Sequence, residues 1–343
     1  MKISLDLTFA VPIWRFFYES DDKYKIPYEF IHDGKKYTNG ICIIQFGWNI
    51  TKNKLINDNN FLNEKVLVKN ARNVILCAPN IETLNLFKKY RPTLLSCLAN
   101  HNAFIDENVY KIDRTVEQKF DLIVSSAFSK YKNYNLIKNI QNACAIGYYT
   151  SDTNDTTLPS SNIYCPNFDN KKRTKENCSW VELLTICNFY NMSKIGGIFS
   201  VVEGACFSSS EYLLCGLPVL SCKSDGGREI WYNNENSIIC EPNEQSVIDN
   251  LKIMIDKYNN GEYDREKIRK THIEEMEVHR NNLTNIVIKF LQMIILDIPS
   301  FNELKDSLKY YHSNCWYGMD YVSINYEKQI IKEKQALKVL DIN

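Results

Sequence analysis

The sequence lacks an excess of charge of either sign. Its 343 residues carry 41 Lys and Arg against 41 Asp and Glu, so the formal net charge is zero. A chain whose main partner is nucleic acid usually gathers an excess of basic residues to meet the phosphates. The balance therefore argues against nucleic acid as a main partner.

Spacings typical of metal sites are also missing. No Asp-x-Asp triplet occurs in the chain, and none of its twelve cysteines forms a Cys-x-x-Cys pair. Several cysteines, such as Cys77, Cys97 and Cys215, lie inside apolar runs. Scattered buried thiols are typical of a reducing compartment. We therefore expect no metal, no cofactor and a cytoplasmic location.

No stretch is long and apolar enough to span a bilayer. The segment "IVIKFLQMIIL" (286–296) is shorter than the roughly 20 residues required, and Lys289 interrupts it. At the N-terminus, Asp6 breaks the apolar run of "MKISLDLTFAVPIW", which favours a first strand over a signal peptide. We expect no membrane span.

The chain does contain short apolar runs that alternate with segments of helical periodicity. Its first third predicts strands at 40–47, 73–79 and 93–99, with a helix at 82–90 between the last two. Strand, helix, strand is the pattern of a parallel sheet with crossover helices.

A polar stretch at 106–119 reads as a connection, after which the alternation restarts. Further strands are predicted at 120–128, 143–149, 196–202, 218–222 and 236–240. Helices are predicted at 132–141, 180–190, about 208–215, 244–258 behind an Asn243 cap, and about 264–296. The fold class is therefore α/β, with two successive parallel-sheet units.

The stretch "VVEGACFSSSEYLLCGLPVLSCKSDGGREI" (201–230) gathers candidate binding groups where a strand gives way to a helix. Ser208 stands at the predicted helix start, whose unpaired N–H groups suit a phosphate. Glu211, one turn on, could accept hydrogen bonds from ribose hydroxyls, and Glu203 from those of a second group. The array suits a nucleotide-activated sugar, although two surface carboxylates would show the same spacing.

This stretch resembles the signature of family-four retaining glycosyltransferases with the GT-B fold. That pattern is Glu, seven residues, Glu, a Gly-x-Pro-Val turn and a Gly-Gly pair. The matching positions are Glu203, Glu211, Gly216, Pro218, Val219, Gly226 and Gly227, whereas Glu229 comes one position early. Upstream, "FSKYKN" (128–133) resembles the family's Phe-Ser-x-x-Lys-Asn segment. The likeness covers about residues 120–260.

The resemblance implies a role for each matched residue. Glu203 contacts the donor sugar at the reaction centre, Glu211 holds the ribose, and Lys132 neutralises the leaving diphosphate. Backbone groups of the turn that follows Glu203 bind phosphate and sugar oxygens; these residues are Gly204, Ala205, Cys206, Phe207 and Ser208.

One position departs from the family pattern. Ala127 stands where the family usually has an Arg that binds phosphate. Lys130 or Arg228 could substitute for that Arg, or the donor could bind more weakly.

Three polar residues end the predicted strand at 93–99, namely Asn100, His101 and Asn102. A lone His is often structural, but enzymes of the GT-B fold often place a His of the first domain near the donor sugar. His101 is therefore a candidate catalytic residue, and the two asparagines are candidates for the acceptor side of a cleft.

These inferences predict a GT-B protein with two Rossmann-like domains facing an interdomain cleft. The predicted parts are an acceptor-side domain at 1–115, a nucleotide-sugar-binding domain at 116–298, and a helical tail at 299–343 that packs back on the first domain. The expected activity is metal-independent, retaining transfer of a sugar from a nucleotide-diphosphate sugar to a hydroxyl of a glycan or other acceptor.

Two other functions stay open at this point. A nucleotide-sugar epimerase shares the GT-B architecture and a Gly-Gly turn near its phosphate site, so "DGGREI" (225–230) does not separate the two. A decayed transferase that only binds the donor would also fit, because Ala127 removes a cation. The base, the sugar and the acceptor are not readable from the sequence.

Overall fold

The computed structural model describes most of the chain from Val74 onward, together with four short strands before it. The described residues are 7–9, 30–32, 35–37, 41–45, 74–90, 92, 94–149, 156–168, 173–203, 206–224, 226–292, 300–302, 304–306 and 308–309. The chain forms two compact units, one of Met1–Phe104 with Met276–Asn343 and the other of Ile105–Glu275. The domain boundaries near 115 and 298 stay predictions, and most of the tail at 299–343 lies outside the described residues.

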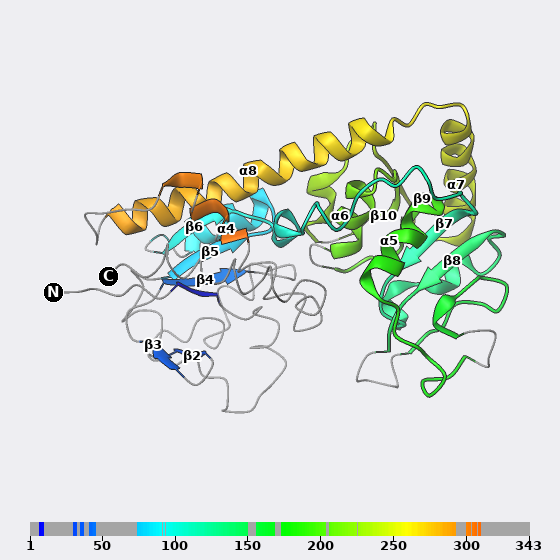
Figure 1. Cartoon of the computed structure of the whole chain (residues 1–343), viewed down its shortest axis with the longest axis horizontal. Coiled ribbons are helices and arrows are strands. Elements are labelled where there is room, and N and C mark those ends of the chain that lie inside the picture. Colours follow the sequence, from blue (N-terminus) through cyan, green and yellow to red (C-terminus); the bar gives the residue numbers. More distant parts are fainter. Residues whose placement is uncertain are drawn as a thin grey trace. The chain divides into compact units, whose positions relative to one another are not determined.

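The first unit contains a parallel sheet in the order β1-β4-β5-β6 (Figure 1). Its strands are β1 (Leu7–Phe9), β4 (Ile41–Gln45), β5 (Val74–Ala78) and β6 (Leu95–Leu98), with helix α4 (Ile81–Tyr90) between β5 and β6. A separate antiparallel pair joins β2 (Phe30–His32) to β3 (Lys35–Tyr37). The predicted strand, helix and strand of this unit are confirmed.

The apolar run of β5 explains its place inside the sheet. Ile75, Leu76, Cys77 and Ala78 are all fully buried. A continuous apolar run, without alternation, is typical of a parallel strand covered on both faces.

The second unit contains a five-stranded parallel sheet in the order β11-β10-β9-β7-β8. The strands are β7 (Phe120–Ser125), β8 (Ala143–Ile146), β9 (Ser193–Ile198), β10 (Val219–Cys222) and β11 (Ser237–Cys240). The helices are α5 (Leu183–Asn191), α6 (Phe207–Leu214) and α7 (Glu244–Asn259). The chain leaves β7 toward β8 on one side and leaves β9 toward β10 on the other, so the order reverses between β7 and β9.

Helix α7 begins as the sequence predicts. The Asn243 side chain accepts a hydrogen bond from the Ser246 amide at 2.9 Å, which caps the helix. Val247, Leu251 and Met254 are buried in the core of the second unit. The cap and the apolar face are both confirmed.

The helix predicted at 132–141 is wrong in type. Two short 3-10 helices occupy half of that segment, η4 (Lys130–Lys132) and η5 (Tyr134–Ile137). Asn133 between them is left-handed, with φ 56°, and such a residue cannot continue a right-handed helix. The predicted apolar face is nevertheless largely buried, since Ile137 and Ile140 both lie in the core.

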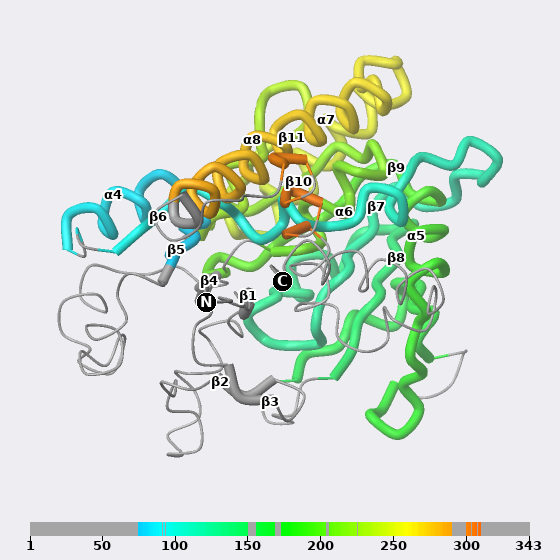
Figure 2. The backbone as a smooth tube through the Cα atoms, turned by 60° about the vertical axis from the view of Figure 1, so that its left-hand side comes forward, coloured from blue at the N-terminus to red at the C-terminus, as the bar shows by residue number. Residues whose placement is uncertain are grey.

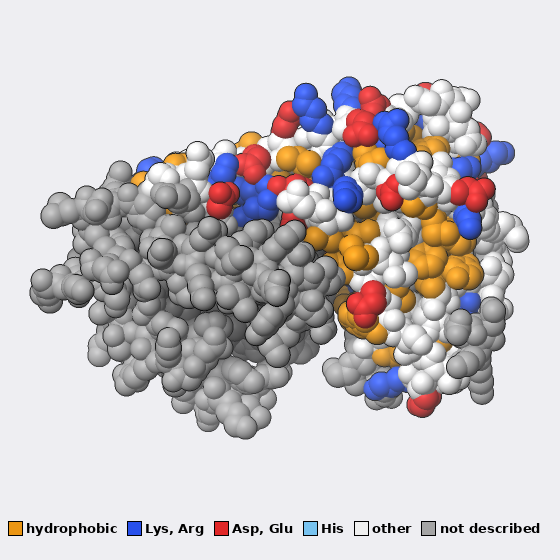
Figure 3. Space-filling model, in the orientation of Figure 1, with side chains coloured by type: hydrophobic (Ala, Val, Ile, Leu, Met, Phe, Trp, Pro, Cys, Tyr) orange, Lys and Arg blue, Asp and Glu red, His pale blue; other side chains and the backbone are white. Residues whose placement is uncertain are grey.

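Helix α8 (Arg265–Gln292) is one continuous helix that contributes residues to both units (Figure 2). Within the first unit, Asn282 donates to the Leu98 carbonyl at 3.1 Å, and Lys305 pairs with Glu277 at 2.9 Å. Among the described residues, no helix is long and apolar enough to cross a membrane. Both signs of charge are interspersed on the described part of the face shown in Figure 3, as the zero net charge leads one to expect.

Candidate functional site

A pocket lies at the carboxyl ends of β7 and β9, where the strand order of the second sheet reverses. About 10 Å³ of it can hold the centre of a water-sized sphere, and the figure of about 210 Å³ for the surrounding empty space includes open solvent. The lining residues are Val124, Ser125, Ser126, Lys132, Gly197, Ile198, Phe199, Ser200 and Cys206. Ligands of open α/β sheets bind at such a reversal, outside the carboxyl ends of the strands.

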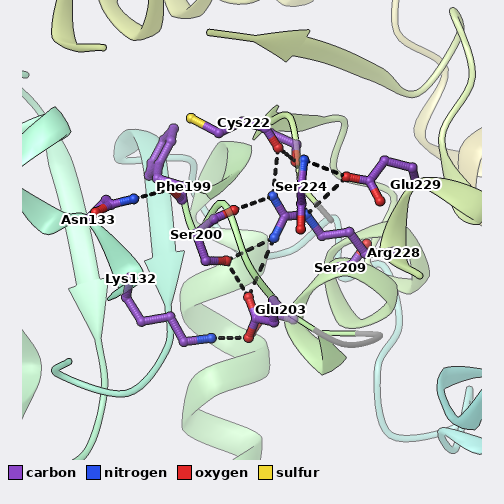
Figure 4. Close-up of polar contacts among 12 residues, drawn as sticks. Lys132, Asn133, Phe199, Ser200, Glu203, Ser209, Cys222, Ser224, Arg228 and Glu229 are labelled. Carbon is purple, nitrogen blue, oxygen red and sulfur yellow. Dashed lines mark hydrogen bonds and ion pairs between the residues drawn. The ribbon is translucent and has the colours of Figure 1, made fainter. Parts of the chain in front are cut away.

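Glu203 stands beside this pocket and contacts two cations (Figure 4). Lys132 Nζ donates to Glu203 Oε1, and Arg228 Nη1 lies 3.5 Å from Oε2. The Ser200 hydroxyl also donates to Oε2. The fold thus brings together Glu203, Lys132 and Arg228, three residues for which the sequence predicted separate roles.

Burial and charge act in opposite directions on this ion pair. Burial raises the pKa of Glu203, but the charge and hydrogen bond of Lys132, together with Ser200 and Arg228, lower it by more, so the pKa stands below its usual value. Burial likewise lowers the pKa of Lys132, and the Glu203 carboxylate raises it above its usual value. Both groups are therefore charged at neutral pH.

Arg228 is wholly buried, and the described protein surrounds its guanidinium. Its Nη2 donates to two carbonyls, of Ser200 at 2.7 Å and of Cys222 at 2.6 Å. Nη1 donates to the Ser200 hydroxyl at 2.8 Å and Nε to the Ser221 hydroxyl at 3.2 Å. Arg228 is thus placed to support Glu203 and the ends of two strands, and direct donor binding by Arg228 stays a prediction.

Lys130, the other residue that could substitute for the family's Arg, is exposed, whereas Arg228 is buried. Lys130 lies on η4, two residues before Lys132. Ala127 is buried, with 2% of its surface exposed. A contact between Lys130 and the donor stays a prediction.

Glu211 lies on α6 and is bound by two tyrosines. The Tyr110 hydroxyl donates to Oε1 at 2.9 Å, and the Tyr190 hydroxyl donates to Oε2 at 2.6 Å. Glu211 is buried, with 7% of its surface exposed. It is therefore not a surface carboxylate, which removes the alternative that its spacing from Glu203 left open.

Helix α6 begins directly at the pocket. Cys206, which precedes it, has φ 47°, a left-handed value that is uncommon for residues other than glycine. Ser208 donates to the Ser125 carbonyl at 2.5 Å and Ser209 to the Tyr232 hydroxyl at 2.8 Å, which fixes the first turn. Gly204 and Ala205 lie outside the described residues, so their predicted backbone contacts stay predictions.

Cys206 is an unreactive thiol in this setting. Burial raises its pKa to about 12, and the charge of Glu203 acts in the same direction. The thiolate is the nucleophilic form of cysteine, and it is scarce at neutral pH when the pKa is so high. Cys206 and Phe207 thus contribute backbone to the start of α6, and their donor contacts stay predictions.

The three polar residues after β6 form part of a short 3-10 helix, η3 (His101–Phe104), and all are buried. Asn100 donates from its side chain to the Pro79 carbonyl at 3.0 Å and accepts from the Asn102 amide at 2.9 Å. Its own amide donates to His279 Nδ1 at 3.0 Å. Asn100 therefore holds this turn together, and roles for His101 and Asn102 in catalysis or acceptor binding stay predictions.

Sequence reasoning missed three residues of this site. Ser200 lies just past β9 but inside the strand predicted at 196–202, so nothing in the sequence set it apart. Tyr110 is the one aromatic residue in the polar stretch 106–119, which distinguishes it. Tyr190 ends a helical apolar pattern, and nothing in the sequence separates it from an ordinary core residue. Across the described part of the chain, no group of three or more His, Cys, Asp or Glu could hold a metal ion.

No protein-family profile matches the chain, and no curated protein matches it either. Solved structures do. Anabaena HepE in complex with UDP gives a TM-score of 0.52 at 12% identity, over 74% of this chain and 72% of HepE. A variant of S. aureus TarM gives a TM-score of 0.49 at 14% identity, over 72% of this chain and 51% of TarM. Sucrose-phosphate synthase from Thermosynechococcus elongatus gives a TM-score of 0.46 at 10% identity, over 74% of this chain and 67% of the synthase.

The likeness to HepE concerns the fold, since the sequences are only 12% identical. Together with two α/β units that each contain a parallel sheet, it confirms the predicted GT-B fold. The assignment to family four through the Glu-seven-Glu signature stays a prediction.

Proposed function

We propose that the protein is a glycosyltransferase that moves a sugar from a nucleoside-diphosphate sugar to an acceptor hydroxyl, with retention of anomeric configuration and without a metal. The observation that carries this proposal is the Lys132–Glu203 ion pair beside a pocket at the strand-order reversal of the second sheet. It unites a cation for the diphosphate with a carboxylate for the sugar.

Lys132 is the cation of the leaving group. Its side chain belongs to the pocket lining and is 9% exposed. A diphosphate that enters the pocket competes with Glu203 for the ammonium, and negative charge grows on the diphosphate as the glycosidic bond breaks. An ammonium fixed at that point stabilises the transition state more than the ground state.

Glu203 meets the sugar. Ser200 and Arg228 hold its Oε2, while Lys132 holds Oε1. When the diphosphate draws Lys132 toward itself, the support from the other two residues keeps the carboxylate in place. A fixed negative charge there stabilises the positive character that develops at the sugar. The acceptor hydroxyl then attacks from the face that the leaving group vacates, as retention requires, and its proton passes to the departing diphosphate.

Two features support independence from metal. The chain has no Asp-x-Asp triplet, and Lys132 supplies positive charge at the leaving group. The location is proposed to be cytoplasmic, since the cysteines of the described residues are free thiols and most of them are buried.

The test is a panel of nucleoside-diphosphate sugars incubated with and without sugar or glycan acceptors. UDP-sugars come first, because HepE was crystallised with UDP. Release of nucleoside diphosphate that depends on acceptor, with retention seen by NMR at the new linkage, is the expected result. Lys132→Met should abolish it, whereas Lys138→Met, at a largely exposed lysine paired with Glu244, should not.

The same panel separates the alternatives. Interconversion of donor sugars without acceptor would identify an epimerase. Binding without release or interconversion, across the full panel, would identify a binding protein and overturn the proposal.

A further inference from the structure

The two tyrosines on Glu211 form a clamp, defined here as Tyr110 and Tyr190. They approach opposite oxygens of the carboxylate, at 2.9 and 2.6 Å. Their rings stack on each other with centroids 6.2 Å apart and an interplanar angle of 24°. Hydrogen bonds to both oxygens fix the plane of the carboxylate.

Both hydroxyls act as donors to a carboxylate. Burial raises the pKa of Tyr190 well above its usual value, and the charge of Glu211 raises it further. The phenol therefore keeps its proton and donates it to the carboxylate. Hydrogen bonds to a charged acceptor are about twice as strong as neutral ones, which makes the clamp a firm restraint.

The clamp also connects to the pocket through ring contacts. Tyr190 meets Tyr212 edge to face, with centroids 4.9 Å apart. The Tyr212 hydroxyl accepts from the Ser125 amide at 2.6 Å, and Ser125 lines the pocket. Glu211 is thus held by the same group of rings that supports the end of β7.

The backbone at Tyr110 is fixed independently of its side chain. Arg269 of α8 donates to the Tyr110 carbonyl at 2.5 Å and to the Glu107 carbonyl at 2.6 Å. The same guanidinium donates to the carbonyl of Leu214, the last residue of α6. Arg269 therefore sets the position of Tyr110 relative to the helix that carries Glu211.

We propose that Tyr110 and Tyr190 are positioning residues that aim the Glu211 carboxylate at the ribose hydroxyls of the nucleotide, and so give the site its preference for ribose over deoxyribose. This inference rests on the proposed function and on the ribose contact that the family resemblance implies for Glu211. Loss of either hydroxyl frees the carboxylate to rotate, and a rotated carboxylate cannot accept from two adjacent hydroxyls together.

The experiment measures the Kd of UDP, 2′-deoxy-UDP and inorganic pyrophosphate by calorimetric titration. It uses the full chain as wild type, Tyr110→Phe, Tyr190→Phe and the double variant. Phenylalanine keeps the ring contacts and removes only the hydroxyls. Tyr258→Phe is the control, because it removes a tyrosine hydroxyl that is hydrogen-bonded to a side chain outside the clamp; that hydroxyl accepts from Gln118, whereas the clamp hydroxyls donate.

Wild type is expected to bind UDP about tenfold more tightly than 2′-deoxy-UDP, equivalent to about 1.4 kcal/mol. Each clamp variant should reduce that ratio severalfold, and the double variant should bring it close to one. Pyrophosphate affinity should stay unchanged throughout, and Tyr258→Phe should keep the wild-type ratio.

Three outcomes would overturn the inference. An unchanged ratio in the folded double variant would show that the clamp does not serve the ribose. An equal loss of affinity for all three ligands would show a structural role alone. Failure of wild type to bind any nucleotide would refute the proposed function itself, and the inference with it; in the first two cases the proposed function stands.

Discussion

Lys132 Nζ donates directly to Glu203 Oε1, although 71 positions of sequence separate the two residues. Both side chains are about nine-tenths buried, with exposed fractions of 9% and 10%. A buried pair of this kind is costly to break by removing one partner, since the other is left as an uncompensated charge. The stability of the second unit and the proposed chemistry therefore depend on the same contact.

Replacing Lys132 by Met should destabilise the protein by about 3 kcal/mol, at the lower end of the range for a broken buried pair, because Arg228 still lies 3.5 Å from Glu203. Chemical denaturation measures the loss. The double variant Lys132→Met with Glu203→Gln should recover part of it, since Glu203 is then no longer a buried charge without its ammonium partner. Equal stability of the single variant and wild type would contradict the burial of this pair.

The depressed pKa of Glu203 predicts a loss of stability in acid. A carboxyl whose pKa is lower in the folded than in the unfolded state stabilises the fold above its ordinary pKa, 4.5 for Glu, and loses this contribution as pH falls through the folded value. Unfolding free energies should therefore fall more steeply below about pH 4.5 in wild type than in Glu203→Gln. Parallel curves for the two proteins would rule out this role of Glu203.

The contacts of Arg228 predict that lysine cannot replace it. A lysine lacks the planar fork that reaches the carbonyls of Ser200 and Cys222 together. Arg228→Lys should destabilise the protein by about 2 kcal/mol through unmet buried carbonyls and should lower turnover by loosening Glu203. Arg114→Lys, at an exposed ion pair with Glu266, should change stability by less than about 1 kcal/mol.

Gly196 on β9 leaves room for a ring beneath the site. A Cβ added there would lie 2.3 Å from Cδ2 of Tyr212, whose hydroxyl is already bound to the Ser125 amide. Gly196→Ala should therefore destabilise the protein by about 1–3 kcal/mol through overpacking. A double-mutant cycle with Tyr212→Leu checks the cause, because the alanine should cost less once the ring is gone.

Chelation should not stop transfer if Lys132 carries the leaving-group charge. Turnover in excess EDTA is compared with turnover after addition of Mn²⁺ or Mg²⁺. Similar rates are the expected outcome. Loss of activity in EDTA that metal restores would show that Lys132 is not sufficient for the leaving group.

Much of the fold is predictable because local patterns and tertiary packing agree. The apolar run of β5 and the Asn243 cap of α7 each act over a few residues, and both are found as predicted. The helix prediction for 132–141 was wrong because Asn133, whose backbone is left-handed, interrupts an apolar spacing that otherwise resembles that of a helix. Apolar spacing reports which face is buried, and it does not report backbone handedness.

The charged residues of the candidate site could be predicted from the sequence, whereas the residues that hold them in position were harder to predict. Lys132 and Glu203 carry a sequence signature, and the structure brings them into contact. Tyr110 and Tyr190 act on Glu211 from 101 and 21 positions away, and Tyr190 looks like an ordinary core residue until the helices are packed. Partners that depend on tertiary packing leave no local pattern to read.

The division of the chain between its two units affects the order in which they form during translation. The second unit is one continuous stretch, Ile105–Glu275, whereas the first needs Met276–Asn343 in addition to Met1–Phe104. At ribosomal rates, the first unit waits roughly 10–30 s for its remaining segment while the second is being made. During that time the Leu98 carbonyl and the Asn100 amide lack their later partners, Asn282 and His279. Vectorial synthesis therefore leaves the first unit, rather than the second, with incomplete packing until the last segment of the chain is made.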